Sequence, residues 1–316
     1  DPFFDFEDAP TLETSTDFYT SNSGIYSAVD LKAGNHFITP GVRVYHESTI
    51  NRTGVDPRVS YRYNIDKTHL IKAAIGKYHN EPEPGDSDPT FGNPDLDFEK
   101  SLHYILGWEK TWKGGLWTTD LQSYHKRNYD VIVNDPETNL SNDGEIRSQG
   151  FELFLRRNRT DRMFGWLAYS YSVTEQRDSA TQNFVPSEFD QRHNLNLVAN
   201  YSFTGVWDVG FRINYFTGDR YTPVSGAVFN SDLDKFQPLS DPADLNSETL
   251  PDYHQLDLYS TYQFLFNKSI LTLRTGIEFL ALRPNAFGVD YNEDYSETQF
   301  QTGIPPIPFI ELEGEF

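Results

Sequence analysis

Apolar and polar residues alternate along much of the chain. From Trp207 to Tyr215 the odd positions are large and apolar, and the even positions are small or polar. Such a period of two is typical of a β-strand with one apolar and one polar face, and helical periodicity is nearly absent. The pattern predicts thirteen strands, at residues 22–32, 37–47, 56–64, 69–79, 99–111, 116–129, 145–158, 163–174, 191–203, 207–217, 253–265, 269–282 and 306–316.

The connections between the predicted strands alternate between short and long. The short ones contain residues that favour tight turns, as at Gly34-Asn35 and Thr204-Gly205. The long ones are rich in Asp and Glu, so the negative charge gathers on one rim of an antiparallel up-and-down sheet. These long connections lie at residues 48–55, 80–98, 130–144, 175–190, 218–252 and 283–305.

Two all-β architectures fit this alternation, a soluble β-sandwich and a transmembrane β-barrel. Strands of globular proteins average about 5–6 residues, whereas several predicted strands alternate over 10 to 13 residues. A tilted strand needs about 9–11 residues to cross a bilayer. Short turns on one rim and long loops on the other are typical of outer-membrane barrels. We therefore predict an antiparallel up-and-down transmembrane β-barrel in a bacterial outer membrane.

Composition narrows the classes of function. The 316 residues include no Cys, which excludes disulfides, thiolate zinc sites and cysteine nucleophiles. The chain has 47 acidic and 26 basic residues, a formal net charge of -21, which argues against a nucleic-acid partner. The 8 His are scattered, and no nucleophile elbow, phosphate loop or zinc-binding motif occurs. We therefore expect no catalytic residue, no cofactor or metal site and no enzyme activity.

A series of short phrases resembles the C-terminal part of the barrel of TonB-dependent outer-membrane receptors, over most of residues 22–316. The phrases are Thr39–Val44, Asp56–Ser60, Leu70–Tyr78, Gly150–Leu153, Phe189–Leu195 and Leu312–Phe316. Members of this family resemble one another in a 22-stranded barrel around a plug domain, and in a short segment that contacts TonB. The resemblance implies a fragment of a receptor for nutrient uptake, energised through TonB, whose ligand is a siderophore, cobalamin, an oligosaccharide or a peptide.

No plug and no TonB-contacting segment is recognisable in the chain. Residues 22–316 are therefore expected to form the C-terminal part of the barrel, and residues 1–21 an acidic extracellular segment. An odd number of strands cannot close with both ends in the periplasm, and open sheet edges in lipid are prohibitively costly. We expect a separate N-terminal polypeptide, with the plug and about nine strands, to complete the barrel.

The alternation assigns candidate residues to two faces. Polar positions expected to line the lumen and pack against a plug are Arg43, Arg62, Lys72, Glu152, Arg156, Arg212, Arg274 and Glu278. Aromatic positions expected to form bands at the membrane interfaces are Trp108, Trp117, Tyr169, Tyr171, Trp207 and Tyr262. The last strand ends in an aromatic residue, which resembles the signal that the barrel-assembly machinery reads, at Ile310, Leu312, Gly314 and Phe316.

Three functions remain open at this point. The leading one is energy-coupled uptake, with the TonB complex, the barrel-assembly machinery, the lipid bilayer and a small-molecule or oligomeric ligand as partners. The second is a passive, porin-like channel without a plug, and the third is a structural or adhesive surface barrel without transport. A plug and a coupling segment on the partner polypeptide favour the first, and ion conductance without them favours the second. Absence of both, with a partner bound at the loops, favours the third.

Overall fold

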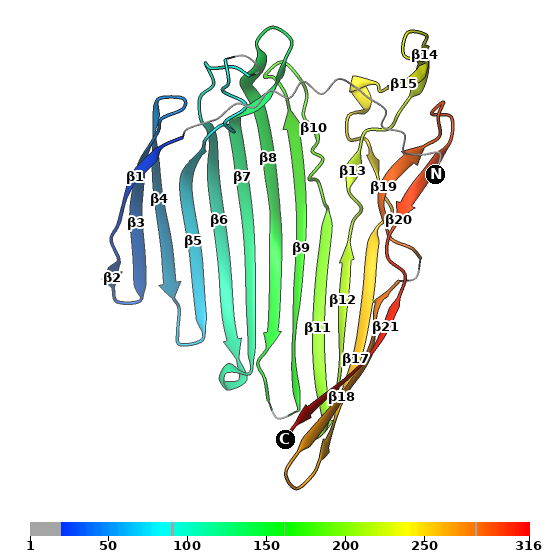
Figure 1. The fold of residues 1–316 in the computed structure, drawn as a ribbon. Coiled ribbons are helices and arrows are strands. Elements are labelled where there is room, and N and C mark those ends of the chain that lie inside the picture. The colour runs from blue at the N-terminus through cyan, green and yellow to red at the C-terminus, as the bar shows by residue number, and fades with distance from the viewer. Residues whose placement is uncertain (1–19, 90–91, 161, 282) are drawn as a thin grey trace.

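A single antiparallel sheet joins the long strands of the chain in sequence order (Figure 1). The computed structural model describes residues 20–89, 92–160, 162–281 and 283–316. Within these ranges the sheet has 15 strands, because the short strands β2 (Leu31–Ala33) and β10 (Val185–Pro186) pair with its members. Its main path runs through β1 (Asn22–Ala28), β3 (His36–Glu47), β4 (Arg52–Asn64), β5 (His69–Asn80), β6 (Glu99–Trp112), β7 (Trp117–Asp135), β8 (Asn139–Arg157), β9 (Met163–Arg177), β11 (His193–Thr204), β12 (Trp207–Phe216), β17 (Tyr253–Leu265), β18 (Ile270–Leu280) and β21 (Ile307–Glu315).

Except for η1 (Lys113–Gly115), which lies in the tight turn between β6 and β7, the remaining elements belong to long connections, which gather at the upper rim in Figure 1. We call this the loop rim and the opposite edge the turn rim. No helix among the described residues is long and apolar enough to cross a membrane. The short elements are β13 (Arg220–Tyr221), which pairs with β16 (Glu248–Thr249), β14 (Gly226–Asn230) with β15 (Lys235–Leu239), β19 (Ala286–Tyr291) with β20 (Thr298–Thr302), and the 3-10 turns η1 (Lys113–Gly115) and η2 (Pro242–Asp244).

The all-β antiparallel architecture predicted from the alternation is confirmed, and each predicted strand overlaps a strand of the main path. Two predicted long loops are wrong. The segment 48–55 is a tight turn, because Asn51 adopts a φ of 50° and the ladder resumes at Arg52. The segment 130–144 is mostly the end of a β-hairpin, because a bulge at Asp130, with a φ of 58°, keeps the two strands paired.

The predicted first strand, 22–32, is also wrong in detail, because it is broken into β1 and β2. The ladder between β1 and β3 stops next to Pro40, which accepts a hydrogen bond from Val29 but has no N–H to donate in return. The predicted extracellular segment 1–21 lies outside the described residues except for its last two positions.

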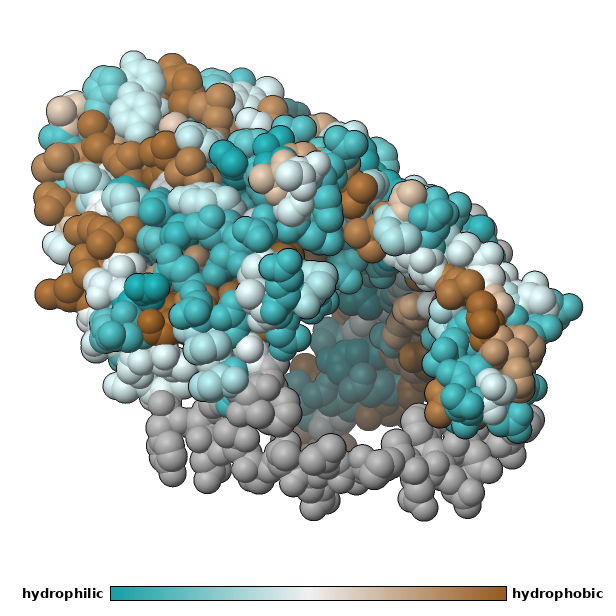
Figure 2. Space-filling model, turned by 90° about the horizontal axis from the view of Figure 1, so that it is seen from above, coloured by the Kyte–Doolittle hydropathy of each residue, from teal (hydrophilic) through white to brown (hydrophobic). Residues whose placement is uncertain are grey.

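The register divides the sheet into two faces, because directly paired residues of an antiparallel ladder share a face and successive residues alternate. Trp207 pairs with Tyr262, and Arg212 pairs with Asp257. We call the face of the first pair the apolar face and that of the second pair the polar face. Seen from the loop rim, the sheet bends around a hollow, and hydrophilic residues are visible inside it (Figure 2).

Among the described residues, no second layer covers either face of the sheet wall. Buried apolar residues of the described chain are few and lie mainly under the loops, as Leu96, Phe98 and Leu250 do. On the wall itself large side chains stay exposed, Leu106 at 58% and Leu312 at 65%. An apolar face of this size must be covered by another apolar medium or partner.

Candidate functional site

All eight polar residues singled out by the alternation lie on the polar face. Tracing the ladders from Arg212 in both directions, each of the other seven falls on the same side of the sheet. They come from six different strands, so they form a distributed lining and not one compact cluster.

Some of these residues are paired with carboxylates of the same face. The Lys72 Nζ lies 2.5 Å from Asp120 Oδ2 and 3.4 Å from Glu109 Oε2. The Arg274 guanidinium lies 3.0 Å from Glu311 and 2.9 Å from Glu313. Such pairs neutralise polar-face charge, so these side chains stabilise the wall more than they attract an anion.

A second group of arginines on the polar face lies over aromatic rings. The guanidinium of Arg43 is 4.6 Å from the ring centre of Tyr45, and that of Arg62 is 4.3 Å from the ring centre of Phe37. Arg58, which the alternation alone does not distinguish, lies 4.8 Å from the ring of Tyr26.

These three arginines form no ion pair with any carboxylate among the described residues. Cation–π contacts orient a guanidinium without neutralising it. The polar face of β3 and β4 therefore presents Arg43, Arg58 and Arg62 as fixed positive charges.

All six aromatic residues singled out by the alternation lie on the apolar face. Trp117 and Trp207 are at the turn-rim ends of β7 and β12. Tyr169 and Tyr171 lie further toward the loop rim, where their rings are 5.9 Å and 5.8 Å from that of Phe151. The apolar face thus has aromatic groups toward both rims, as an interfacial arrangement requires.

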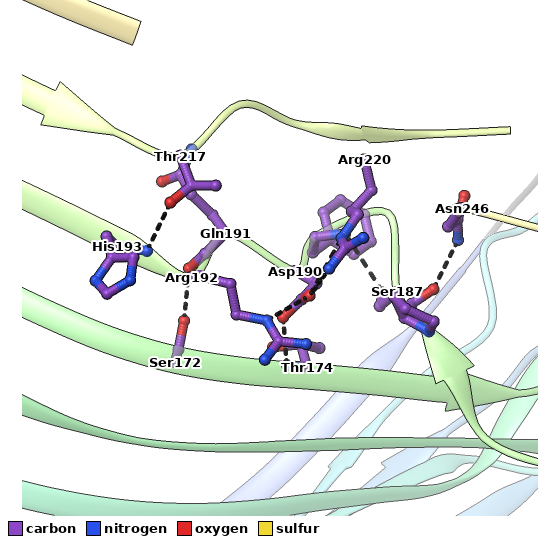
Figure 3. A network of polar contacts seen from close by, with 12 residues as sticks. Ser172, Thr174, Ser187, Asp190, Gln191, Arg192, His193, Thr217, Arg220 and Asn246 are labelled. Atoms are coloured by element: carbon purple, nitrogen blue, oxygen red, sulfur yellow. Dashed lines mark hydrogen bonds and ion pairs between the residues drawn. The ribbon is translucent and has the colours of Figure 1, made fainter. Parts of the chain in front are cut away.

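The phrase Phe189–Leu195 folds into a buried polar network at the loop rim (Figure 3). Asp190 is fully buried and accepts a hydrogen bond of 2.9 Å from the backbone N–H of Thr174. It also accepts from Arg192 Nε at 2.8 Å and from Arg220 Nη2 at 3.0 Å. A buried carboxylate is stable only when it is paired and hydrogen-bonded, and Asp190 meets both conditions.

This network joins two long connections to the wall. Arg220 and Asn246 belong to the connection between β12 and β17, whereas Asp190 and Pro186 belong to the one between β9 and β11. The Asn246 Nδ2 donates to the carbonyl of Pro186 at 3.0 Å. The sequence analysis singles out the phrase Phe189–Leu195 but not its long-range partners Arg220 and Asn246, because no local sequence pattern marks those two residues. The network fixes the bases of the loops.

No group of three or more metal-ligating side chains occurs in the described parts of the chain. The polar residues described above are instead engaged in ion pairs, cation–π contacts and hydrogen bonds that hold strands and loops together. This arrangement holds the strands and loops in place and presents fixed charges on a curved wall, which suits the binding of a ligand.

Comparison with known proteins identifies the family to which this sheet belongs. The model of the TonB dependent receptor-like β-barrel matches residues 2–278. Since that match covers most of the 316 residues, the chain belongs to this family, and the resemblance expected from the sequence is confirmed. Members of the family are bacterial outer-membrane receptors that serve transport, and the relatives named below are receptors, not enzymes.

Individual relatives agree with this assignment. The ferric-pyoverdine M114 receptor PbuA of Pseudomonas sp. (strain M114) is 28% identical over 134 residues, which is 39% of the chain and 16% of that receptor. The solved FpvA of P. aeruginosa bound to heterologous pyoverdines has a TM-score of 0.66 at 16% identity, over 94% of this chain and 38% of that one. The siderophore receptor PiuA from Acinetobacter baumannii has a TM-score of 0.69 at 12% identity, over 93% and 43%. The chain spans less than half the length of these relatives, and the structural likeness shows the shared fold.

Proposed function

We propose that the chain forms wall strands of an outer-membrane receptor that imports a ferric siderophore. The polar face lines the lumen, the apolar face meets lipid, and the loop rim faces outward. The observation that carries the ligand class is the set of guanidiniums of Arg43, Arg58 and Arg62, which lie over aromatic rings and form no ion pair among the described residues. Arginine forks bind carboxylate and other anionic oxygens of the kind that chelators use. The similarity to a ferric-pyoverdine receptor supports the same class.

The proposed mechanism needs parts beyond these residues. In this proposal a plug fills the lumen against the polar face, and contact of the plug with TonB supplies the energy for release of the ligand. The outer edges of β1 and β21 have no strand partner among the described residues. Unpaired backbone in lipid is costly, so we propose that further strands close the barrel between these two edges and that a separate N-terminal polypeptide carries them together with the plug.

The proposal also assigns roles to the aromatic residues of the apolar face and to the end of the last strand. The aromatic residues of the apolar face anchor the barrel at the two membrane interfaces. Ile310, Leu312 and Gly314 lie on the apolar face of the last strand, and the side chain of Phe316 is fully exposed. We propose that these four positions form the signal for the barrel-assembly machinery.

Uptake of radioactive iron tests the proposed function. Cells that carry the complete receptor as their only ferric-siderophore receptor should accumulate iron from a ferric pyoverdine, and loss of TonB should abolish accumulation. The Arg43→Gln, Arg58→Gln, Arg62→Gln variant should bind the ferric complex at least about tenfold more weakly. Uptake that persists without TonB, together with ion conductance, would instead establish a passive channel. Cell adhesion without uptake would establish a surface barrel.

A further inference from the structure

A cluster of arginines lies on the apolar face near the loop rim, around the carboxylate of Glu145. Arg127 Nε and Arg147 Nε donate to Glu145 Oε1 at 2.6 Å and 3.0 Å. Arg177 Nη2 donates to Glu145 Oε2 at 2.6 Å. The Glu145 side chain is only 6% exposed, so three guanidiniums converge on one buried carboxylate.

The two outer arginines keep the ends of their forks free. Arg127 and Arg147 contact Glu145 through Nε, and their terminal nitrogens form no hydrogen bond within the part of the chain that the structure describes. Their side chains are 49% and 42% exposed. The guanidiniums of Arg147 and Arg177 also lie 4.0 Å and 4.7 Å from the ring centre of Phe184. The forks are therefore held in place while their outward-facing donors stay available.

The register places this cluster directly beyond the aromatic groups of the apolar face. Phe151 pairs with Tyr171 on that face, and the unbroken ladder continues from this pair to Glu145 and Arg177. Arg147 lies four positions along β8 from Phe151, which is about 13 Å at the rise of a strand. Aromatic side chains mark the boundary between the hydrocarbon and the headgroups, so cations just beyond them lie at headgroup depth.

The cluster keeps a surplus of positive charge. Arg127 and Arg147 are direct cross-strand partners, an arrangement that is repulsive by itself. Glu145 relieves this repulsion, and Glu175, which pairs with Arg147, is the other carboxylate of this patch. Three arginines of β7, β8 and β9 thus face two carboxylates, and the next row of this face toward the turn rim is His125, Gln149 and Val173.

We propose that Arg127, Arg147 and Arg177 form a binding site for the phosphate group of a lipid headgroup in the leaflet beside the loop rim. A guanidinium fork matches two phosphate oxygens, and forks that are already oriented lose little entropy on binding. The acyl chains of the same lipid would lie along Phe151 and the apolar residues below it. This site rests on the proposed lipid contact of the apolar face but not on the identity of the transported ligand.

Native mass spectrometry of the receptor purified from outer membranes tests the site, with bisphosphorylated lipid A and its dephosphorylated form as probes. The wild-type protein should retain the phosphorylated lipid, and Arg127→Gln, Arg147→Gln should bind it at least about tenfold more weakly. Arg127→Lys, Arg147→Lys keeps the charge near Glu145 but lacks the forks, and it should also lose affinity. Arg159→Gln, Arg162→Gln, an equal charge change in an exposed turn at the opposite rim, should bind like the wild type.

Three results would overturn the proposal. The first is equal retention of the two lipids by the wild type. The second is unchanged retention of bisphosphorylated lipid A by both double variants. The third is an affinity of the wild type for inorganic phosphate that equals its affinity for bisphosphorylated lipid A. A heat-modifiable band in gel electrophoresis verifies that each variant is folded. Iron uptake measured on the same variants separates the lipid site from the proposed function. Loss of the lipid with normal uptake supports a lipid site that transport does not require, and unchanged lipid retention contradicts the lipid site whatever the uptake.

Discussion

The Arg212 guanidinium on β12 lies directly opposite the Asp257 carboxylate on β17 and donates from Nε to Oδ2 at 2.6 Å. On its other side, Asp257 has no partner on β18, because the ladder between β17 and β18 shifts register between Leu256 and Leu258. Its Oδ1 accepts the backbone N–H of Phe279 at 2.9 Å, and Phe279 has a φ of 58°. One carboxylate thus joins three strands at a bulge and stabilises a backbone conformation that is rare for a bulky residue.

Removal of Asp257 should therefore destabilise the barrel more than removal of its arginine. We expect Asp257→Ala to lower the free energy of unfolding by about 2–4 kcal/mol, because an N–H and a guanidinium lose their acceptor. Arg212→Gln should cost about 1–2 kcal/mol, since Arg212 is half-exposed and Asp257 keeps other donors. Urea unfolding of the receptor in lipid vesicles measures both. Arg274→Gln is the control, with an expected cost below about 1 kcal/mol because its partners are exposed, and a larger cost there would contradict the account.

A charge on the apolar face should be costly, and the same charge one residue away should not. Leu197 pairs with Ile213 and Leu167 on the apolar face, whereas Asn196 lies on the polar face opposite Asn214. We expect Leu197→Arg to cost about 2–4 kcal/mol if the residue lies near the middle of the bilayer. The matched Asn196→Arg variant should cost less than about 1 kcal/mol. The fraction of heat-modifiable barrel and the urea midpoint report the difference, and equal costs would argue for water on both faces.

Gly150 is a position where the chain needs the absence of a side chain. A Cβ there would lie 2.2 Å from the backbone oxygen of Tyr171, which is too close without movement of β9. Gly150→Ala should therefore lower the free energy of unfolding by about 1–3 kcal/mol. Gly205→Ala is the control, because a Cβ at Gly205 meets nothing within 4 Å. Unfolding of both variants under the same conditions checks the prediction, and a larger loss for the control would refute it.

Asp66 in the turn between β4 and β5 should titrate at unusually low pH. Hydrogen bonds from Thr68 Oγ1 at 2.7 Å and Thr68 N at 2.6 Å, with further ones from His69, hold the pKa of Asp66 well below its ordinary value. A depressed pKa in the folded state means that the stabilisation is present above the ordinary pKa of Asp and is lost as the pH falls through the lower folded value. Carboxyl NMR shifts measure the midpoint. Thr68→Val should raise the pKa toward the ordinary value and Thr68→Ser should not; no change in the Val variant would disprove the cause.

Alternation allowed much of the wall to be predicted, because a sheet with different media on its two faces imposes that alternation on every strand. The faces of residues such as Arg62 and Trp207 follow from a period of two and from the continuity of neighbouring ladders. Turns were predicted less well, because a residue in left-handed conformation such as Asn51 or Asp130 decides whether a ladder continues.

The contacts that organise the loop rim could not be predicted, because they join residues far apart in the chain. Nothing local marks Arg220 as the partner of Asp190, and the convergence of Arg127, Arg147 and Arg177 on Glu145 depends on the register of three strands. Pairwise patterns along one strand contain no information on such distant partners.

The central claim, that one face of this sheet meets lipid and the other a water-filled or plugged lumen, can be measured directly on β12. The chain has no Cys, so single cysteines at successive positions from Asp208 to Asn214 provide a clean scan. With the receptor in vesicles, spin labels at Val209, Phe211 and Ile213 should be accessible to oxygen dissolved in lipid, and those at Asp208, Gly210 and Asn214 should not. The strict alternation is the predicted result, and equal accessibility at odd and even positions would contradict the account.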